Sequence, residues 1–251
     1  MSDGKLRQLT EKKRKLDAAR PLPEELIKNL DEWFKVELTY TSNAIEGNTL
    51  SRQETALVIE KDITVEGKTI EEHLEAKNHA RAVDFIKSLV DKKRQDISEN
   101  IILDIHRIIL QKIDDKNAGK YRSVAVRIAG SMAIMPNPLK VPELMSGLIE
   151  WLHSKNSHHS VKIAADTHFK FVSIHPFADG NGRTARLLMN VLLQQSGYPP
   201  AIIRKEDRKD YLNSLETGQT KGEMEDYYGI IYDAVERSLD IYLDSIKKSR
   251  E

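Results

Sequence analysis

The sequence predicts an all-α fold, a bundle of helices that carries one short β-hairpin. Apolar residues recur at the three- and four-residue spacing of amphipathic helices through most of the 251 residues. Capping residues and glycines mark the starts and ends of these stretches. Strict alternation appears once, at 124–128, and predicts the hairpin. We expect a helical region at 1–95, a core at 96–200 and further helices packed on that core at 201–251.

The composition excludes several classes of protein. Lys plus Arg equals Asp plus Glu at 39 each, whereas general nucleic-acid binders carry a basic excess. The absence of cysteine excludes disulfides and thiolate metal sites. No apolar run approaches the length of a membrane span, and none follows the basic N-terminus as in a signal peptide. We therefore expect a cytoplasmic protein with no membrane association and no general nucleic-acid binding.

The first elements are two helices. Lysines and arginines between residues 5 and 15 predict a solvated helix face. Gly47 suits the position just after a helix end, which places Glu46 in the last turn of the second helix. A carboxylate there opposes the helix dipole and would be better placed beside a cation. The second helix, within 24–40, is indicated by the apolar stripe of Leu26, Leu30, Trp33, Phe34 and Leu38.

The later elements follow the same rules. Ser51 and Thr69 each begin a capping box, and Pro142 suits the first turn of another helix. We expect His168 in the core rather than on a metal, and a long final helix at 223–248. Three apolar stripes predict the helices between them: Ile101, Ile102, Ile105, Ile108 and Ile109; Leu144, Leu148, Trp151 and Leu152; Ala164, Ala165, His168 and Val172.

The predicted hairpin occupies about residues 122–138. Val124, Val126 and Ile128 alternate with other residues and predict its first strand. A turn follows at 129–131, and the chain from Met132 onward returns. A purely structural hairpin on a helical domain is one explanation of this pattern.

The segment 175–186, HPFADGNGRTAR, carries most of the chemistry. Gly180 and Gly182 let backbone N–H groups approach a ligand closely. A helical apolar pattern begins after Asn181 and ends near Gly197, so the glycines lie at a helix N-terminus. Unpaired N–H groups and the positive end of the helix dipole favour an anion there.

Charged side chains in this segment suit a polyphosphate. Arg183 and Arg186 are three residues apart and share one helix face, where their planar groups suit phosphate oxygens. Asp179 has the wrong charge for phosphate unless a cation such as Mg²⁺ bridges the two. A neutral imidazole at His175 suits a general base. A phosphate-binding turn without chemistry and a structural capping turn remain the plainer alternatives. The segment matches neither a Walker loop nor a dinucleotide fingerprint.

The segment resembles the signature of the Fic family (filamentation induced by cAMP), H-x-F-x-[D/E]-G-N-G-R-x-x-R, at every defined position. The resemblance runs from about residue 40 to the C-terminus. It implies a Fic fold and transfer of AMP from ATP to a protein hydroxyl, with His175 as the base and Asp179 holding Mg²⁺. It also implies that phosphates are bound by Gly180, Asn181, Gly182, Arg183, Thr184 and Arg186. Phe177 is expected to anchor the loop in the core.

A second motif, at 42–47, resembles the family's inhibitory motif, [S/T]-x-x-x-E-[G/N]. The resemblance implies that Glu46 pairs with Arg186 and takes it away from the γ-phosphate of ATP. Because this motif precedes the signature, the chain is similar to the class whose inhibitory helix is N-terminal. An ordinary solvated glutamate at a helix end is the alternative.

The resemblance assigns further contacts. The hairpin would act as a flap that presents the target protein by strand pairing, with Ile128, Ala129, Gly130 and Ser131 near the nucleotide. Tyr211 and Gln219 match positions that touch the nucleoside, although Tyr211 equally suits a packing role. Self-modification and a homodimer are further expectations.

Three other activities stay open at this stage. Glu46 could position a water to release AMP from a modified protein. The transferred group could be UMP or phosphocholine instead of AMP. The chain could also bind a nucleotide as a sensor without catalysis.

Overall fold

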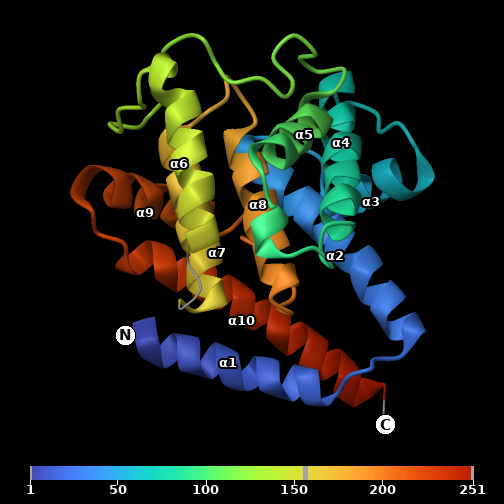
Figure 1. Ribbon diagram of the computed structural model, residues 1–251. Helices are drawn as coiled ribbons and strands as arrows, with labels where there is room; N and C mark the ends of the chain where they lie inside the picture. The colour runs from blue at the N-terminus through green and yellow to red at the C-terminus, as the bar shows by residue number, and fades with distance from the viewer. Residues whose placement is uncertain (1, 155–157, 250–251) are drawn as a thin grey trace.

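The computed structural model describes residues 2–154 and 158–249, and its regular structure is helical. Helices α7 (Ser160–Ile174) and α8 (Asn181–Gln195) lie side by side at the centre (Figure 1). The all-α prediction is confirmed for the described residues. The other elements are α1 Ser2–Ala18, α2 Glu24–Glu46, α3 Arg52–Lys61, α4 Ile70–Lys87, α5 Glu99–Leu110, α6 Val141–Ser154, α9 Arg208–Lys221, α10 Glu225–Lys248 and the short 3-10 turns Arg94–Asp96 and Pro138–Lys140.

Helix α8 is enclosed by its neighbours. Helices α2, α4, α5 and α7 all pack against it, and apart from Gly182 its residues from 181 to 193 are buried. A helix buried on all sides is normally apolar all round. Here Arg183, Arg186 and Asn190 occupy buried positions. Because buried polar groups need hydrogen-bond partners, these side chains must be satisfied by the surrounding helices.

Helices α1 and α10 run together along the lower edge of the molecule (Figure 1). The predicted solvated face of α1 is partly wrong, because two of its lysines form ion pairs with α10. Lys12 lies 2.7 Å from Glu236 and 2.6 Å from Asp240, and Lys5 pairs with Glu236 as well. The carboxylates of α10 face these lysines, a contact that the N-terminal sequence alone could not reveal.

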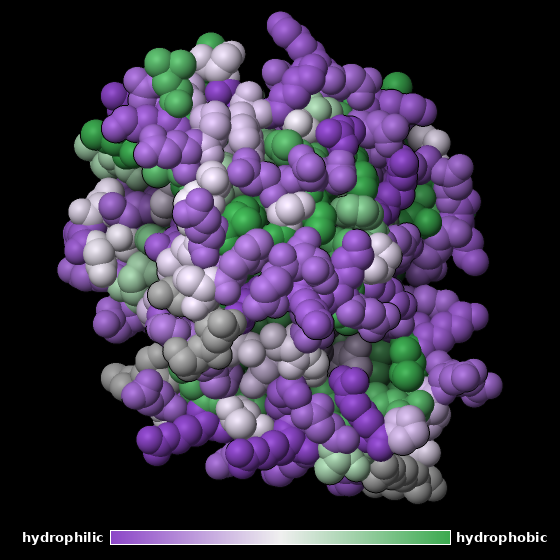
Figure 2. Space-filling view, in the orientation of Figure 1, coloured by the Kyte–Doolittle hydropathy of each residue, from purple (hydrophilic) through white to green (hydrophobic). Residues whose placement is uncertain are grey.

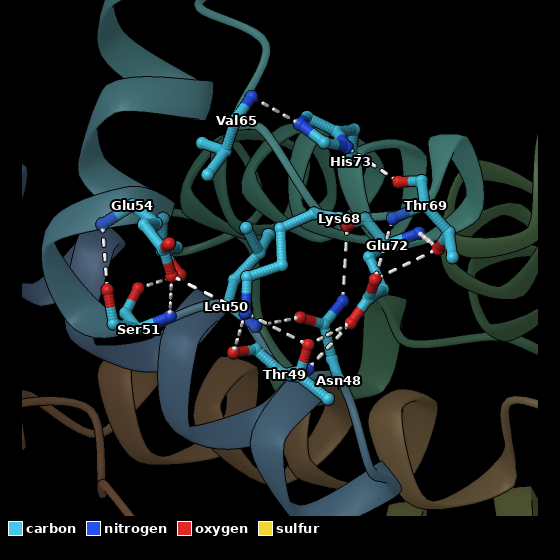
Figure 3. A network of polar contacts seen from close by, with 11 residues as sticks. Asn48, Thr49, Leu50, Ser51, Glu54, Val65, Lys68, Thr69, Glu72 and His73 are labelled. Atoms are coloured by element: carbon cyan, nitrogen blue, oxygen red, sulfur yellow. Dashed lines mark hydrogen bonds and ion pairs between the residues drawn. The ribbon is translucent and has the colours of Figure 1, made fainter.

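Most predicted helix ends are confirmed. Gly47 adopts a positive φ of 108° directly after α2, and Ser51 and Thr69 form both predicted capping boxes. Figure 3 shows the polar contacts that join these turns. The backbone N–H and hydroxyl of Thr49 donate to Glu72 at 2.9 and 2.6 Å. The turn that follows α2 is therefore fastened to the start of α4.

The predicted β-hairpin is not formed in the described residues. Residues 122–138 form a loop with a turn in which Ser131 N–H donates to the carbonyl of Ile128 at 3.1 Å. An isolated two-stranded ribbon is only marginally stable. The two arms are held instead by Arg122, whose guanidinium donates to the carbonyls of Val124 (3.0 Å) and Pro136 (2.7 Å). We refer to residues 122–138 as the flap.

Within the described ranges, no helix is both long and apolar enough to cross a bilayer. The face seen in Figure 2 is largely hydrophilic, and apolar side chains reach it only in small separate areas. On and just after the flap, the large exposed apolar side chains are Val124, Met132, Ile134 and Leu139.

Three buried histidines make stability depend on pH. Burial lowers the pKa of His79 and His168 to about 3 and that of His106 to about 4. Their contribution is complete above the unfolded pKa of about 6.5 and is lost as pH falls from there toward the folded values, because only the unfolded chain then binds the protons. As pH falls through that window, each histidine lowers the free energy of unfolding by about 1.4 kcal/mol for every pH unit. Urea titrations at pH 7.5 and 5.5 should differ by about 4 kcal/mol, and equal stabilities would contradict the expectation.

Candidate active site

The loop between α7 and α8 is shaped by its apolar anchor. Helix α7 ends at Ile174. His175 follows in a left-handed conformation with φ of 50°, and Gly180 adopts φ of 74° directly before α8. Between them Phe177 turns inward, is fully buried and stacks on His106 with ring centroids 3.6 Å apart. The predicted core role of Phe177 is confirmed.

Asn181 braces this loop. Its Oδ1 accepts from Phe177 N–H and its Nδ2 donates to the Phe177 carbonyl, both at 2.9 Å. The resemblance implied a phosphate contact for Asn181, but in this structure its buried side chain is committed to the loop. Gly180 provides no side-chain cap, so the first backbone N–H groups of α8 remain available to an anion.

We expect Asn181→Ala to lower the free energy of unfolding by about 1–3 kcal/mol, because it leaves two buried backbone groups of Phe177 without partners. Urea unfolding followed by circular dichroism measures this change. Asn213→Ala, at an exposed position of α9, is the matched control. A loss no larger than that of the control would refute the bracing role.

His106 was not singled out by the sequence, yet it supports the same loop. Gly119 N–H donates to its Nδ1 at 2.9 Å, so the ring proton lies on Nε2, which donates to the Asp179 carbonyl at 3.0 Å. A Cβ at Gly180 would lie 3.2 Å from this ring. The tight contact and the positive φ together require glycine at this position.

His175 is in the right state to accept a proton. Burial lowers its pKa most, and the cation of Arg122 lowers it further, whereas the Val172 backbone, Glu46 and Asp179 act in the opposite direction. The net effect favours the neutral imidazole at pH 7. Its Nδ1 is buried and meets no hydrogen-bond partner among the described residues. Its backbone carbonyl accepts from Arg122 Nε at 2.8 Å.

Arg186 is bound to the C-terminal end of α2. Its Nη2 donates to Glu46 Oε1 at 2.6 Å, and its guanidinium also donates to the hydroxyl and carbonyl of Ser42, both at 3.0 Å. Burial alone would lower the pKa of Arg186, but the Glu46 carboxylate and Tyr211 together outweigh it and raise the pKa. The ion pair implied by the resemblance is therefore present.

The carboxylate of Glu46 also lies against the start of α8. A methyl group added to Gly182 would overlap Glu46 Oε1. Glu46 therefore occupies the side of the first turn of α8, where unpaired N–H groups favour negative charge. An anion that bound at this turn through Gly182 and Arg186 would compete with Glu46 for the same space.

One of the carboxylates that bind Arg183 was not predicted from the sequence. Its Nη1 donates to Glu75 of α4 at 2.7 Å and its Nη2 to Asp179 at 3.0 Å, while the arginine itself is only 3% exposed. Glu75 also accepts from Asn48, which follows the α2 cap, at 2.8 Å. The pairing of Arg186 with Glu46 was implied by the resemblance, whereas the pairing of Arg183 with Glu75 was not predicted. In this structure each arginine is paired with a glutamate from the N-terminal region.

Asp179 is the residue expected to hold Mg²⁺. Its side chain faces Arg183, and 70% of it is exposed. Across the described residues, no group of three or more His, Cys, Asp or Glu side chains is placed to hold a metal. A single accessible carboxylate fits Mg²⁺, which often takes one or two protein oxygens and completes its shell with phosphates and water.

One cavity, with a volume of about 350 Å³, brings together many of the predicted residues. Tyr211 is buried, and its hydroxyl forms a hydrogen bond of 2.8 Å with Nε2 of His168. It therefore packs in the core and also lines the cavity. The sequence did not single out Arg208 and Glu216, because charged residues on a helix surface carry no distinguishing sequence signal. The predicted residues in its wall are Glu46, Ile128, Ala129, Gly130, Ser131, His175, Gly182, Arg186, Tyr211 and Gln219.

The remaining predicted residues lie outside the wall of this cavity. Asp179 and Arg183 form the ion pair beside it, and Gly180 and Asn181 shape the loop. Thr184 is fully buried, and its hydroxyl meets no partner among the described residues. The cavity therefore joins the flap, the end of α7, the start of α8 and α9.

Comparison with known sequences points to one family. The Fic/DOC family profile matches residues 96–193. The chain is 39% identical over 219 residues to the protein adenylyltransferase Fic of Aedes aegypti, covering 86% of this chain and 43% of the relative. It is 39% identical over 208 residues to the protein of the same name from Nematostella vectensis, covering 82% and 48%. The chain thus spans less than half the length of these relatives.

Solved structures agree with the sequence comparison. Fic-1 (residues 134–508) from C. elegans superposes with a TM-score of 0.88 at 31% identity, covering 99% of this chain and 73% of that one. A Fic domain containing signaling protein from Bacteroides thetaiotaomicron VPI-5482 gives a TM-score of 0.86 at 30% identity, covering 97% and 98%.

Proposed function

This chain belongs to the Fic/DOC family, and we propose that it transfers AMP from ATP to a Ser, Thr or Tyr hydroxyl of a target protein. The observation that carries the proposal is the cavity that gathers a neutral His175, the start of α8 and the flap turn around one space. The names of the relatives support the same chemistry.

In the proposed reaction, His175 takes the proton of the target hydroxyl as its oxygen attacks the α-phosphate of ATP. The bond from the α-phosphate to its bridging oxygen breaks, and pyrophosphate leaves. Arg186 and the first turn of α8 would stabilise the charge that develops on the phosphates, as preorganised donors do elsewhere. Mg²⁺ at Asp179 would neutralise phosphate charge when bound.

We propose that the chain rests in an inhibited state. Glu46 pairs with Arg186 and fills the space beside Gly182, so the triphosphate and Glu46 are competitors. Glu75 holds Arg183 in the same way. Activation would require Glu46 to leave this position while Arg186 turns to the phosphates.

The flap is proposed to receive the target as an added strand. Its backbone lacks a ladder partner within the described residues, and Met132 and Ile134 are more than 80% exposed. Strand addition depends on main-chain hydrogen bonds and so presents a hydroxyl with little dependence on sequence.

Matched samples of ATP labelled on the α- or the γ-phosphate test the proposed reaction. The wild type and Glu46→Gly are incubated with Mg²⁺ and a cell extract, and protein-bound label is measured. Transfer of the α-label alone is expected. Transfer of the γ-label would indicate a kinase, and binding without transfer of either label would indicate a nucleotide sensor.

Two further assays separate the remaining alternatives. Label from UTP or CDP-choline in place of ATP would show a different transferred group. Release of AMP from an AMP-modified protein by the wild type would show hydrolysis, for which Glu46 lies on the same cavity as His175.

A further inference from the structure

Arg122 lies at the junction of the flap and the catalytic loop. It is only 5% exposed, although arginine is rarely buried. Its backbone N–H donates to the Pro176 carbonyl at 2.9 Å, and its Nε donates to the His175 carbonyl at 2.8 Å. Its Nη1 and Nη2 donate to the carbonyls of Val124 and Pro136 at 3.0 and 2.7 Å.

These four acceptors belong to two different elements. His175 and Pro176 are in the catalytic loop, whereas Val124 and Pro136 are at the two ends of the flap. All four partners are backbone carbonyls. The hydrogen bonds therefore depend on the conformation of the backbone and not on which side chains the partners carry. The planar fork of arginine donates from three separate nitrogens, whereas the three N–H donors of lysine share one nitrogen and cannot reach acceptors so far apart.

The flap has few other fastenings. Near its tip, Met132 N–H donates to Glu216 of α9 at 2.8 Å, and Ala133 N–H donates to Ser131 Oγ at 3.1 Å. The Ala133–Ser131 bond lies within the flap, and the two arms form no ladder in the described residues. The position of the flap relative to His175 therefore depends on the Met132–Glu216 bond and on Arg122.

We propose that Arg122 is a positioning residue that fixes both ends of the flap to the backbone of His175, and so sets where a presented hydroxyl meets the base. This role rests on the proposed AMP transfer. When a target segment pairs with the flap, the guanidinium of Arg122 thus fixes the position of that segment relative to the imidazole of His175.

The charge of Arg122 supports a second effect on the same base. Among the charged groups near His175, the cation of Arg122 lowers its pKa, and the carboxylates of Glu46 and Asp179 raise it. Arg186, Arg208, Lys209 and Glu216 line the same cavity. Burial lowers the pKa of His175 most, and Arg122 lowers it further. A neutral residue at position 122 should therefore raise the pKa of His175, whereas lysine should leave it nearly unchanged.

Limited trypsin digestion measures flap position without any target. Arg127 is exposed in the flap, so cleavage after it reports flap opening, and cleavage after the exposed Lys205 is the internal reference. Arg122→Lys should speed cleavage after Arg127 about tenfold, as expected for a net loss of about one hydrogen bond. Arg81→Lys, an exposed arginine on α4 that donates to Gln111, is the matched control.

Three additional measurements separate positioning from simple loss of structure. Arg122→Lys should lower the thermal unfolding midpoint by only a few degrees, as expected for one hydrogen bond, and should keep its ATP-analogue affinity near that of wild type. It should lower AMP transfer in the Glu46→Gly background by about tenfold. NMR titration should show a raised His175 pKa in Arg122→Gln but not in Arg122→Lys.

Equal acceleration of cleavage after Arg127 and Lys205, or none in Arg122→Lys, would overturn the positioning role. Wild-type transfer by Arg122→Lys would overturn it as well. If no variant transfers AMP while the trypsin and NMR results hold, the proposed reaction fails and the structural coupling by Arg122 stands.

Discussion

Replacement of His175 by alanine is expected to reduce AMP transfer by about 10²–10⁴-fold, the usual effect of losing a general base. The imidazole is half-buried, its pKa is lowered, and it lines the cavity that would hold ATP and the target hydroxyl. The rate of label transfer from ATP, measured in the Glu46→Gly background, tests this directly.

The backbone at His175 requires a second variant. Its φ of 50° is unfavourable for alanine, so His175→Ala could lose activity through a distorted loop. Asparagine tolerates this conformation and has no basic nitrogen. We expect His175→Asn to bind ATP like the parent and to be equally inactive. A transfer rate near that of the parent in either variant would refute the assignment.

Removal of Glu46 is expected to raise AMP transfer by about 10²-fold or more. A shift of that size requires only about 2.7 kcal/mol of difference between the inhibited and open states. Glu46→Gly removes the ion pair with Arg186 and clears the space beside Gly182. Initial rates of labelling and ATP affinity, compared with wild type, measure the effect.

A conservative variant separates charge from space. Glu46→Gln keeps the size of the side chain and removes its charge, so it should weaken the hold on Arg186 while still crowding the first turn of α8. We expect its rate to lie between wild type and Glu46→Gly. Unchanged or reduced labelling in both variants would show that Glu46 does not inhibit.

Features that depend on neighbouring residues could be predicted from the sequence. The capping boxes at Ser51 and Thr69, the glycine after α2 and the core role of Phe177 all follow from short-range patterns. The Glu46–Arg186 pair was found only because two separate motifs resemble those of one family, since the residues are 140 positions apart.

Features that depend on distant partners were missed. Glu75 is an ordinary helix-surface glutamate until α4 packs on α8, and it meets Arg183 across 108 positions. Arg122 and His106 contact backbone carbonyls, which every residue possesses, so no sequence pattern marks these contacts. The flap failed to form its predicted strands for a related reason. The alternation of residue types shows which side chains would share a face if the segment formed a strand, but a stable strand also needs a partner strand.

The burial of Arg183 and Arg186 within α8 links regulation to folding. Both guanidinium groups lie in the interior, and their negative partners come from α2, from α4 and from Asp179 in the loop before α8, rather than from α8 itself. A buried cation left without a counter-ion is costly. A nucleotide that displaced Glu46 would therefore have to serve as the replacement counter-ion. In the active state the bound substrate would form part of the protein interior. Product release would then leave the cation of Arg186 unpaired, and this cation would attract Glu46 of α2 again.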